Sequence, residues 1–496
     1  MKTMQATLVL LALTVLSTVA LALEPPPGLR LSISRLAGDC RLKLHGAPAN
    51  ARTTLICVDE HQRVQLADWL SCDAAGRAEA SIASLPFLQN LDGIPNEGRM
   101  LKLQVLVQDT SSNEVQLVCY PPSVVVTSEG DDGKSALQWF SSTAEIGSLP
   151  VEGAPRRVVY TPDHTRLFVL TDAPRGHVIC FDGLTHRELG RWLAGELGVD
   201  IVDLLVSADG MRLLALSRGR SDRFQRVSRG RLSIMDIPSL QVQEPGVPVD
   251  LAPGQSARIV EDDETPWRVF VVQASMQIAQ INLFQRYRED LINVDAVADD
   301  AIQEDVRDLV VLNRTLFVAT AGRSSSGALV GALAWFEKGT REHGHIALPG
   351  APIQIRTGTA PDGKPAIFLL LEHDALVLLV DPATKGEIGR LAIPPGAHQL
   401  ALSEAYHLGL LLYPHGNDGA GPEALLRFFD ATGLDLLAGE LALGATALDQ
   451  QPLLDGTGAA VILVLDQNVA RVVDLDTRGF RSDLVLRGRG TSAAER

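Results

Sequence analysis

The densest group of charged side chains in the sequence is the run RGRSDRFQRVSRGR, which extends from residue 218 to residue 231. It holds six arginines and one aspartate within a chain of formal net charge −16. Guanidinium groups bind carboxylate, sulfate and phosphate through paired hydrogen bonds. We therefore predict that an acidic partner, a protein or an acidic polysaccharide, binds Arg218, Arg220, Arg223, Arg226, Arg229 and Arg231. The alternative is a solvated loop whose charge is balanced by acids elsewhere, such as Glu261 and Asp262.

Histidines supply a second possible chemistry, which is metal binding. His343 and His345 are separated by one residue, so on a strand both imidazoles would lie on one face. Two histidines alone leave a metal site incomplete, and the later His398, His407 and His415 are equally compatible with solvated loops. The sequence predicts no metal site and no cofactor.

Aspartates recur where strand-like segments end, at Asp182, Asp236, Asp381, Asp430 and Asp476. A shared ion site is one interpretation. Aspartate at the start of a turn also accepts hydrogen bonds from the backbone two residues on, and turn formers follow these positions, so we predict structural turn residues. The sequence contains no nucleophile elbow, zinc-binding helix motif or phosphate-binding glycine loop, and it identifies no catalytic residue.

Four of the five cysteines fall in the first quarter of the chain, at Cys40, Cys57, Cys72 and Cys119. Their spacing contains no CxxC pair, which disfavours a zinc site. In an exported protein, four clustered cysteines suggest up to two disulfides with three possible pairings. We predict at least one disulfide among them, with Cys180 left in a packed strand.

The N-terminal residues have the pattern of a secretory signal peptide. Lys2 precedes an apolar run from Leu8 to Val19, and Ala20 and Ala22 fit a signal peptidase site. Thr14, Ser17 and Thr18 interrupt the run, whereas a membrane anchor needs about 18 apolar residues in a row. We predict cleavage after residue 22, no membrane span in the mature chain, and a secreted, periplasmic or cell-surface location. An uncleaved anchor is the alternative.

Between residues 29 and 127 the sequence has the pattern of a small β-sandwich. Segments such as LRLSISRL and MLKLQVLVQD alternate apolar and polar residues over strand lengths. About seven such segments suit an immunoglobulin-like or fibronectin-like module. The polar, glycine-containing residues 128–135 follow, and they predict an interdomain linker.

The rest of the chain repeats one pattern at intervals of a few tens of residues. Seven apolar strands recur, and each is followed by a second strand and flanked by two more: LFVLT at Leu167, LLALS at Leu213, VFVVQ at Val269, LFVAT at Leu316, IFLLL at Ile367, LGLLL at Leu408 and VILVL at Val461. A four-stranded sheet of this kind buries both faces when copies stack radially. Residues 136–486 therefore predict a seven-bladed β-propeller, and residues 487–496 a flexible tail. A β-helix is the alternative, but its rungs are shorter than these units. The fold class is all-β.

One repeat resembles a known family. The segment PRRVVYTPDHTRLFVLTDAPRGHVICFDGLT has Pro155, Val158, Pro162-Asp163, Leu167-Phe168-Val169, Asp182 and Thr185 at the positions of the YVTN-type propeller repeat, with His164 in place of its glycine. A weaker copy includes Pro361-Asp362-Gly363, Asp381 and Thr384. The resemblance implies the propeller fold and an exported or surface context, and it implies no reaction.

Composition and fold together point to binding. The acidic charge disfavours nucleic acid and anionic lipid as partners. We predict an exported, non-enzymatic binding or scaffold protein with the propeller as its interaction platform. The alternative is a propeller enzyme of the quinoprotein or dehydrogenase-like kind, whose site would be assembled from distant loop residues.

Overall fold

The computed structural model describes residues 28–495 with interruptions, and it divides them into two compact units. The described residues between 28 and 117 form the first unit, and those between 118 and 495 form the second. The residues that are not described are 1–27, 37–38, 60, 62, 83–84, 86–98, 109, 120–123, 131–134, 141–144, 173–176, 194–200, 218–229, 252–257, 263–264, 266, 274–275, 295–304, 325, 341, 372–374, 405, 415–422, 445–452, 455–458, 465–467, 488 and 496. The predicted signal peptide, residues 1–22, therefore lies outside the described residues.

The first unit is built from two antiparallel sheets. Its three-stranded sheet has the order β1-β2-β5, with β1 Arg30–Leu36, β2 Asp39–His45 and β5 Ala78–Ser81. Its five-stranded sheet has the order β4-β3-β6-β7, with β8 also paired to β6: β3 Arg52–Val58, β4 Val64–Ser71, β6 Arg99–Val107, β7 Thr110–Ser111 and β8 Val115–Cys119. Residues alternate between buried and half-buried along β3 and β6, as expected where one face of a sheet packs on a core.

The predicted disulfide is not found. Cys57 and Cys72 carry free, buried thiols, and among the described residues no disulfide is formed. The side chain of Cys40 lies outside the described residues. Cys57 points into the core from the middle of β3, where it is 4% exposed. Burial raises the pKa of its thiol to about 11. These cysteines therefore act as small apolar core residues, as free cysteines commonly do.

The second unit contains eight four-stranded sheets among its described residues. Seven are formed from four consecutive strands each, and we call them blades 2 to 8. Their strands are β12 Pro155–Tyr160, β13 Arg166–Thr171, β14 His177–Asp182, β15 Glu188–Leu193; β16 Ile201–Val206, β17 Arg212–Ser217, β18 Gly230–Asp236, β19 Gln241–Val249; β20 Ile259–Glu261, β21 Arg268–Gln273, β22 Gln277–Asn282, β23 Tyr287–Asn293; β24 Asp305–Leu312, β25 Thr315–Arg323, β26 Leu329–Glu337, β27 His343–Leu348; β28 Pro352–Thr359, β29 Pro365–Leu371, β30 Leu376–Asp381, β31 Gly386–Ala392; β32 Gln399–Ser403, β33 Leu408–Tyr413, β34 Leu425–Asp430, β35 Asp435–Ala442; and β36 Leu453–Leu454, β37 Ala459–Val464, β38 Val469–Asp474, β39 Gly479–Val485.

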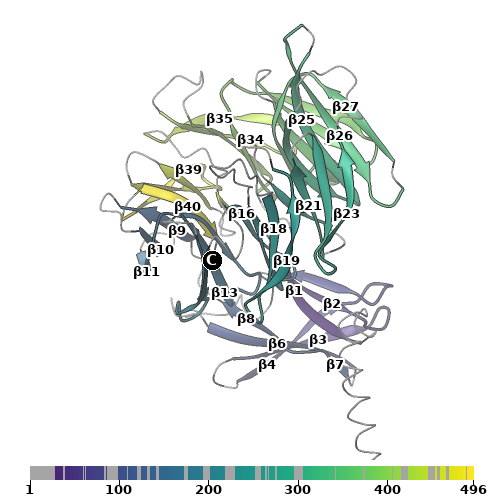
Figure 1. Ribbon diagram of the computed structural model, residues 1–496, viewed down its shortest axis with the longest axis vertical. Coiled ribbons are helices and arrows are strands. Elements are labelled where there is room, and N and C mark those ends of the chain that lie inside the picture. Colours follow the sequence, from purple (N-terminus) through teal and green to yellow (C-terminus); the bar gives the residue numbers. More distant parts are fainter. Residues whose placement is uncertain are drawn as a thin grey trace, which may run out of the picture. The chain divides into compact units, whose positions relative to one another are not determined.

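The remaining sheet, blade 1, joins strands from distant parts of the chain. Its order is β11-β10-β9-β40, with β9 Val124–Glu129, β10 Ser135–Phe140, β11 Glu145–Val151 and the C-terminal β40 Arg489–Glu495. Figure 1 shows β40, in yellow, beside β9, in blue. The prediction of seven blades is therefore wrong by one. The sequence pattern assigns residues 124–127 to the sandwich and 128–129 to a linker, but in the structure residues 124–129 form a largely buried strand of this sheet. The expected flexible tail contains its innermost strand, β40.

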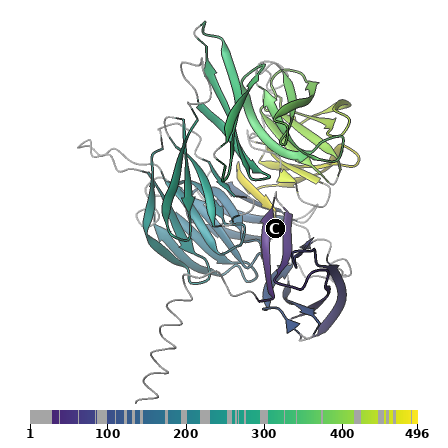
Figure 2. The same ribbon diagram turned by 90° about the vertical axis from the view of Figure 1, so that its right-hand side faces the viewer.

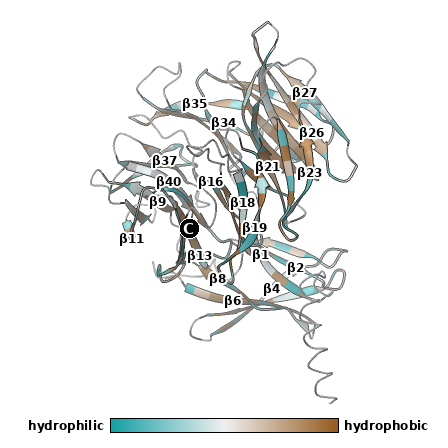
Figure 3. Ribbon diagram, in the orientation of Figure 1, coloured by the Kyte–Doolittle hydropathy of each residue, from teal (hydrophilic) through white to brown (hydrophobic). Residues whose placement is uncertain are grey.

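The eight blades form a closed ring, which is the arrangement of a β-propeller. Eight apolar clusters each join two consecutive blades. The last of them packs Val461 and Val472 of blade 8 against Val124 and Val126 of blade 1. The first strands of neighbouring blades lie against one another, as β12 does against β40 and β16. Figures 1 and 2 show the blades following one another in sequence order from blue through green to yellow. Since both faces of each sheet are covered in this way, the middle strands are continuously apolar, and Figure 3 shows such hydrophobic colouring along β21.

Within the described part of the chain, no helix has the length and apolar character of a membrane span.

Candidate functional site

In each blade the first strand pairs with the second strand, and this pairing places one residue of each first strand at a corresponding position. In blade 2, Arg157 is the residue that follows a β-bulge and pairs with Leu170 of the second strand. Asp203, Asp308 and Gln354 follow bulges at the same place in blades 3, 5 and 6. Gln399 of blade 7 pairs with Leu412 in the corresponding position. Arg258 occupies this position in blade 4, where its carbonyl accepts a hydrogen bond from the Val272 amide.

These six residues form a continuous polar chain across blades 2 to 7, which we call the inner belt: Arg157, Asp203, Arg258, Asp308, Gln354 and Gln399. Each of the first five members contacts the next blade. Arg157 Nη2 lies 3.8 Å from Asp203 Oδ1, and Arg258 Nη1 lies 2.6 Å from Asp308 Oδ1. Gln354 donates from Nε2 to Gln399 Oε1.

Backbone amides of the next blade complete the belt. The Ile259 amide donates to the Asp203 carboxylate, the Ile355 amide donates to Asp308 Oδ2 over 3.2 Å, and the Leu400 amide donates to Gln354 Oε1 over 2.7 Å. In each case a side-chain oxygen of one belt residue accepts a hydrogen bond from a backbone amide of the next blade. That amide belongs to the residue that directly follows the belt residue of that blade. The β-bulges allow this, because the extra residue turns the belt side chain toward the neighbouring blade.

Asp308 is the most buried charged group of the belt, with its side chain 2% exposed. Besides Arg258 and the Ile355 amide, it accepts from Arg356 Nη1 at 2.9 Å and from the Leu309 amide at 2.9 Å. Burial lowers the pKa of the Arg356 guanidinium; Asp308 opposes this effect and Arg258 adds to it. The single Asp308 carboxylate is therefore shared by two guanidiniums from different blades.

Asp203 lies in a different environment. Burial raises the pKa of its carboxyl, although Arg157, Arg258 and the backbone amides of Leu204 and Ile259 oppose the effect. Its one ion pair within the described part of the chain is the 3.8 Å contact with Arg157. The belt thus contains a strongly paired carboxylate at Asp308 and a weakly paired one at Asp203.

The inner belt lies at the end of the propeller where first strands begin and second strands end. Ser217 pairs with both Ile201 and Arg231, so Arg231 lies at this end. We call it the arginine end, defined by Arg157, Arg231, Arg258 and Arg356. Of the six arginines predicted to bind a partner, only Arg231 is described, and it forms an ion pair with Glu244 at 3.8 Å. Arg218, Arg220, Arg223, Arg226 and Arg229 lie outside the described residues, in the connection between Ser217 and Gly230.

The opposite end carries the aspartates that terminate third strands, and we call it the aspartate end, defined by Asp182, Asp236, Asp381, Asp430 and Asp474. As expected, these carboxylates cap turns. Asp430 Oδ1 accepts from the Thr432 and Gly433 amides at 2.8 and 3.0 Å, and these bonds hold the pKa of the Asp430 carboxyl below its usual value. In the last blade the capping residue is Asp474, which accepts from the Thr477 amide, and not Asp476, because β38 ends two residues earlier than we had predicted.

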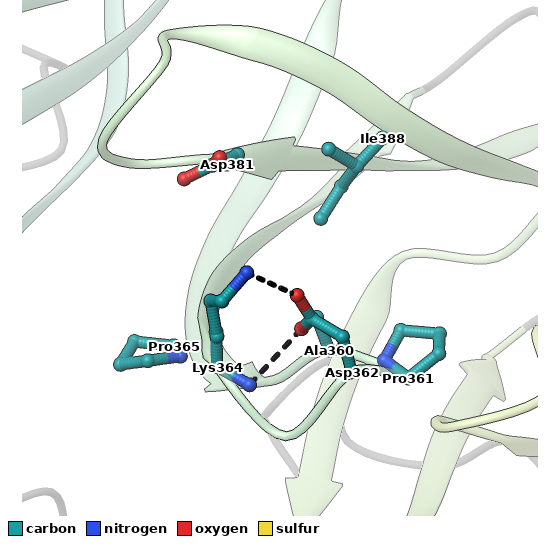
Figure 4. Close-up of a pocket in the computed structure, with 7 residues that line it drawn as sticks. All are labelled: Ala360, Pro361, Asp362, Lys364, Pro365, Asp381 and Ile388. Atoms are coloured by element: carbon teal, nitrogen blue, oxygen red, sulfur yellow. Dashed lines mark hydrogen bonds and ion pairs between the residues drawn. The ribbon is translucent and has the colours of Figure 1, made fainter.

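The aspartate end also holds the hollow drawn in Figure 4. It has a volume of about 230 Å³ and is lined by Ala360, Pro361, Asp362, Lys364, Pro365, Asp381 and Ile388. Asp362 and Lys364 form an ion pair across its floor at 2.8 Å, and Asp381 accepts from the Ala383 amide and the Thr384 hydroxyl. The lysine and the two aspartates of this hollow thus have partners in it or beside it.

His343 and His345 lie on the exposed face of β27, the outermost strand of blade 5. The His343 ring stacks on Phe336 with centroids 6.1 Å apart. In the part of the chain that the structure describes, no group of three or more potential metal ligands comes together.

Comparison with known proteins extends only to the fold. No protein-family model matches the chain, and no curated protein matches its sequence. The solved structure of dihydro-heme d1 dehydrogenase NirN in complex with DHE aligns with a TM-score of 0.56 and 14% identity over 75% of each chain. AztD from Citrobacter koseri aligns with a TM-score of 0.49 and 9% identity over 75% of this chain and 97% of its own. BamB from Moraxella catarrhalis aligns with a TM-score of 0.44 and 11% identity over 71% of this chain and 88% of its own. At these identities the likeness is one of fold, and it agrees with a β-propeller.

Proposed function

We propose that this chain is an exported binding protein that holds an acidic partner at the arginine end of its propeller. The observation that carries the proposal is the register of the blades, which gathers Arg157, Arg231, Arg258 and Arg356 at one end. The chain as a whole has 60 acidic residues against 44 lysines and arginines. Among the described residues these arginines pair with acids of the same end, so a net positive charge there would come from the undescribed arginines of residues 218–229. A basic end on an acidic molecule would attract negatively charged partners and orient their approach.

The inner belt holds neighbouring blades together at this end of the propeller. Because belt side chains bind the backbone of the next blade, the starts of the first strands hold fixed positions relative to one another. Arginines attached to fixed strands lose little conformational freedom on binding, which favours affinity.

The arginine-rich connection between Ser217 and Gly230 begins and ends at the same end of the propeller. Its five undescribed arginines would add to the charge already present there. We propose that this connection, together with Arg231, makes the first contact with an acidic protein or an acidic polysaccharide.

Three finer features belong to the same proposal. The first unit would be an immunoglobulin-like β-sandwich that acts as a spacer or a second contact, because its two antiparallel sheets have alternating burial. The propeller would be of the YVTN type, as the blade 2 sequence suggests. Export through cleavage after residue 22 would place the protein in the periplasm, at the cell surface or in the medium.

Chromatography on immobilised heparin, a sulfated polysaccharide, tests the proposal. We expect the purified chain to be retained at low salt and released as salt rises, because ion pairs at an exposed surface are screened over about 10 Å at 0.1 M ionic strength. Replacing Arg220, Arg223, Arg226 and Arg229 by Ser should release the protein at lower salt.

The matched control removes the same charge elsewhere. Arg187, Arg288, Arg390 and Arg481 are exposed and lie on or beside outermost strands, and their replacement by Ser should change retention less. Equal effects of the two variants would mean that net charge alone governs retention, which would contradict a localised site.

The propeller-enzyme alternative stays a prediction. The likeness to NirN is one of fold, and no described group of side chains favours a particular reaction. Its test is a search for a bound cofactor by absorption spectroscopy and metal analysis of the purified protein.

A further inference from the structure

We infer that the first unit carries a binding surface for an acidic polysaccharide on the outward face of its three-stranded sheet. We call this surface the basic face and define it by Arg30, Arg41, Lys43, His45 and Glu79. The inference goes beyond the proposed function, because it concerns the first unit and not the propeller. It also does not depend on the undescribed connection of residues 218–229.

The middle strand of this sheet, β2, presents three basic side chains on one face. Leu42 and Leu44 are fully buried, so Arg41, Lys43 and His45, which alternate with them, face away from the core. Alternate residues of a strand lie about 7 Å apart. The strand therefore carries a row of basic groups at regular spacing.

The neighbouring strands add one cation and one acid to this row. Arg30 of β1 is exposed and pairs across the sheet with His45, and Glu79 of β5 pairs with Lys43. Arg41 Nη1 lies 3.2 Å and Lys43 Nζ lies 3.6 Å from the Glu79 carboxylate. Burial lowers the pKa of His45, and the charges of Lys43 and Arg30 add to the effect. Register and electrostatics thus place these groups on one small surface.

The basic face keeps a positive charge when its acids are counted. The three strands contain four lysines and arginines, two in β1 and two in β2, against two acids, Asp39 in β2 and Glu79 in β5. Asp39 and Arg35 are counted by charge alone, because their side chains lie outside the described residues. Arg77, directly before β5, pairs with Asp73 at 3.3 Å and adds no net charge. A formal charge of +2 remains on these strands, in a chain whose formal net charge is −16.

The other outward positions of the sheet favour a polysaccharide over a protein or a nucleic acid. They hold serines, at Ser32, Ser34 and Ser81, and none of the outward positions in these described strands is aromatic or aliphatic. A protein partner buries aromatic or aliphatic anchors at the centre of its interface, and single-stranded nucleic acid stacks its bases on aromatic side chains. A polysaccharide with carboxylate or sulfate groups needs only charge-assisted hydrogen bonds. Because each exposed ion pair is weak alone, a polymer that forms several at once is favoured over a small anion.

Isothermal titration of the full chain with a heparin oligosaccharide and, separately, with an oligogalacturonate tests the inference. The titrated chain has Arg220, Arg223, Arg226 and Arg229 replaced by Ser, so that these arginines do not contribute to the measured binding. We expect saturable binding of at least one probe, which distinguishes a sulfated from a carboxylated polysaccharide. Replacing Arg30, Arg41 and Lys43 together by Ser should weaken this binding by roughly fivefold or more, since several exposed ion pairs are lost.

The matched control removes the same charges from the other sheet of the same unit. It replaces two arginines and one lysine by Ser, at Arg52, Arg63 and Lys102, whose side chains are exposed or half-exposed. Its affinity should stay within roughly twofold of the parent chain, because these residues lie outside the basic face.

Glu79→Gln gives a result of the opposite sign, which a loss of folding does not produce. It removes the described carboxylate of the basic face and should tighten binding by roughly twofold. Glu114→Gln is its control, because Glu114 pairs with Lys102 on the other sheet at 3.1 Å, and it should leave the affinity unchanged.

The inference would be overturned if neither oligosaccharide bound saturably, or if the two triple variants weakened binding equally. Stronger binding of polyglutamate or of single-stranded DNA would also overturn it, since the partner would then be a protein or a nucleic acid. Heparin retention of the wild-type chain is read separately. Retention that depends on Arg220, Arg223, Arg226 and Arg229 but not on the basic face would overturn this inference and leave the proposed function standing.

Discussion

Arg258 of blade 4 donates from Nη1 to Oδ1 of Asp308 in blade 5 across 2.6 Å, and the aspartate that it reaches is almost completely buried. Arg356 of blade 6 reaches the other oxygen of the same carboxylate. One carboxylate thus connects three consecutive blades. Asp308 thus makes more contacts between blades than any other residue of the inner belt.

Asp308→Ala should destabilise the propeller by about 3 kcal/mol or more, because removing one partner of a buried ion pair leaves the other charges uncompensated. Guanidinium denaturation at pH 7 measures the change. Asp362→Ala is the control, since Asp362 forms an exposed pair with Lys364 and exposed pairs contribute roughly 0–1 kcal/mol. Equal and small effects of the two substitutions would show that the belt adds nothing to stability.

Removal of residues 488–496 should open the ring, because it deletes β40, the innermost strand of blade 1. The strand β9 would lose its pairing partner, and the apolar contacts of β12 with blade 1 would weaken. We expect a lower Tm and rapid proteolysis. The control lacks only Arg496, which follows the strand. A chain without residues 488–496 that resisted protease as well as this control would contradict closure by β40.

The turn aspartates should make the propeller sensitive to acid. Backbone amides hold the pKa values of Asp381, Asp430 and Asp474 below the usual one, with Ala383, Gly433 and Thr477 as the principal donors. A carboxyl whose pKa is lower in the folded than in the unfolded protein stabilises the folded state at pH values above its unfolded-state pKa, about 3.9. This stabilisation is lost as the pH falls through the folded-state pKa. Asp430→Asn should therefore be less stable than the wild type at pH 7, and the difference should shrink at pH 3 in urea denaturation. A difference that is independent of pH would be inconsistent with this account.

Buried thiols should be unreactive in the folded protein. Burial raises the pKa of Cys57 to about 11 and that of Cys180 to about 12, and the thiolate is the reactive form. We expect a thiol reagent at pH 8 to leave Cys57, Cys72 and Cys180 unmodified in the native chain and to label all three in denaturant, as read by peptide mass spectrometry. Recovery of Cys57 or Cys72 in a disulfide-linked peptide would instead restore the disulfide that the sequence suggested.

The repeated blades could be predicted from the sequence because their second strands are fully apolar and recur at regular intervals. Blade 1 could not, since it joins β9, β10 and β11 at the start of the second unit to β40 at its end, and β40, with the sequence RGTSAAE, has no apolar strand pattern. Blade 1, formed by β9, β10, β11 and β40, is the blade that the seven sequence repeats do not include.

The inner belt was also beyond sequence analysis. Four of its six members follow β-bulges, and the turns between first and second strands differ in length, as those after β24 and β28 show. Arg157, Asp203 and Asp308 are therefore equivalent in space without recurring at a fixed sequence interval. That the arginine-rich run binds an acidic partner stays a prediction, and the belt adds charged groups that composition alone could not place.

Hydrogen–deuterium exchange of the full chain with and without a heparin oligosaccharide shows which end of the propeller an acidic partner binds. We expect slower exchange in peptides that contain the beginnings of β12 and β18 and residues 258–261, and unchanged exchange in the turns after Asp182, Asp381 and Asp430. Protection of those turns, with no change at the beginnings of the first strands, would place the partner at the aspartate end and contradict the account.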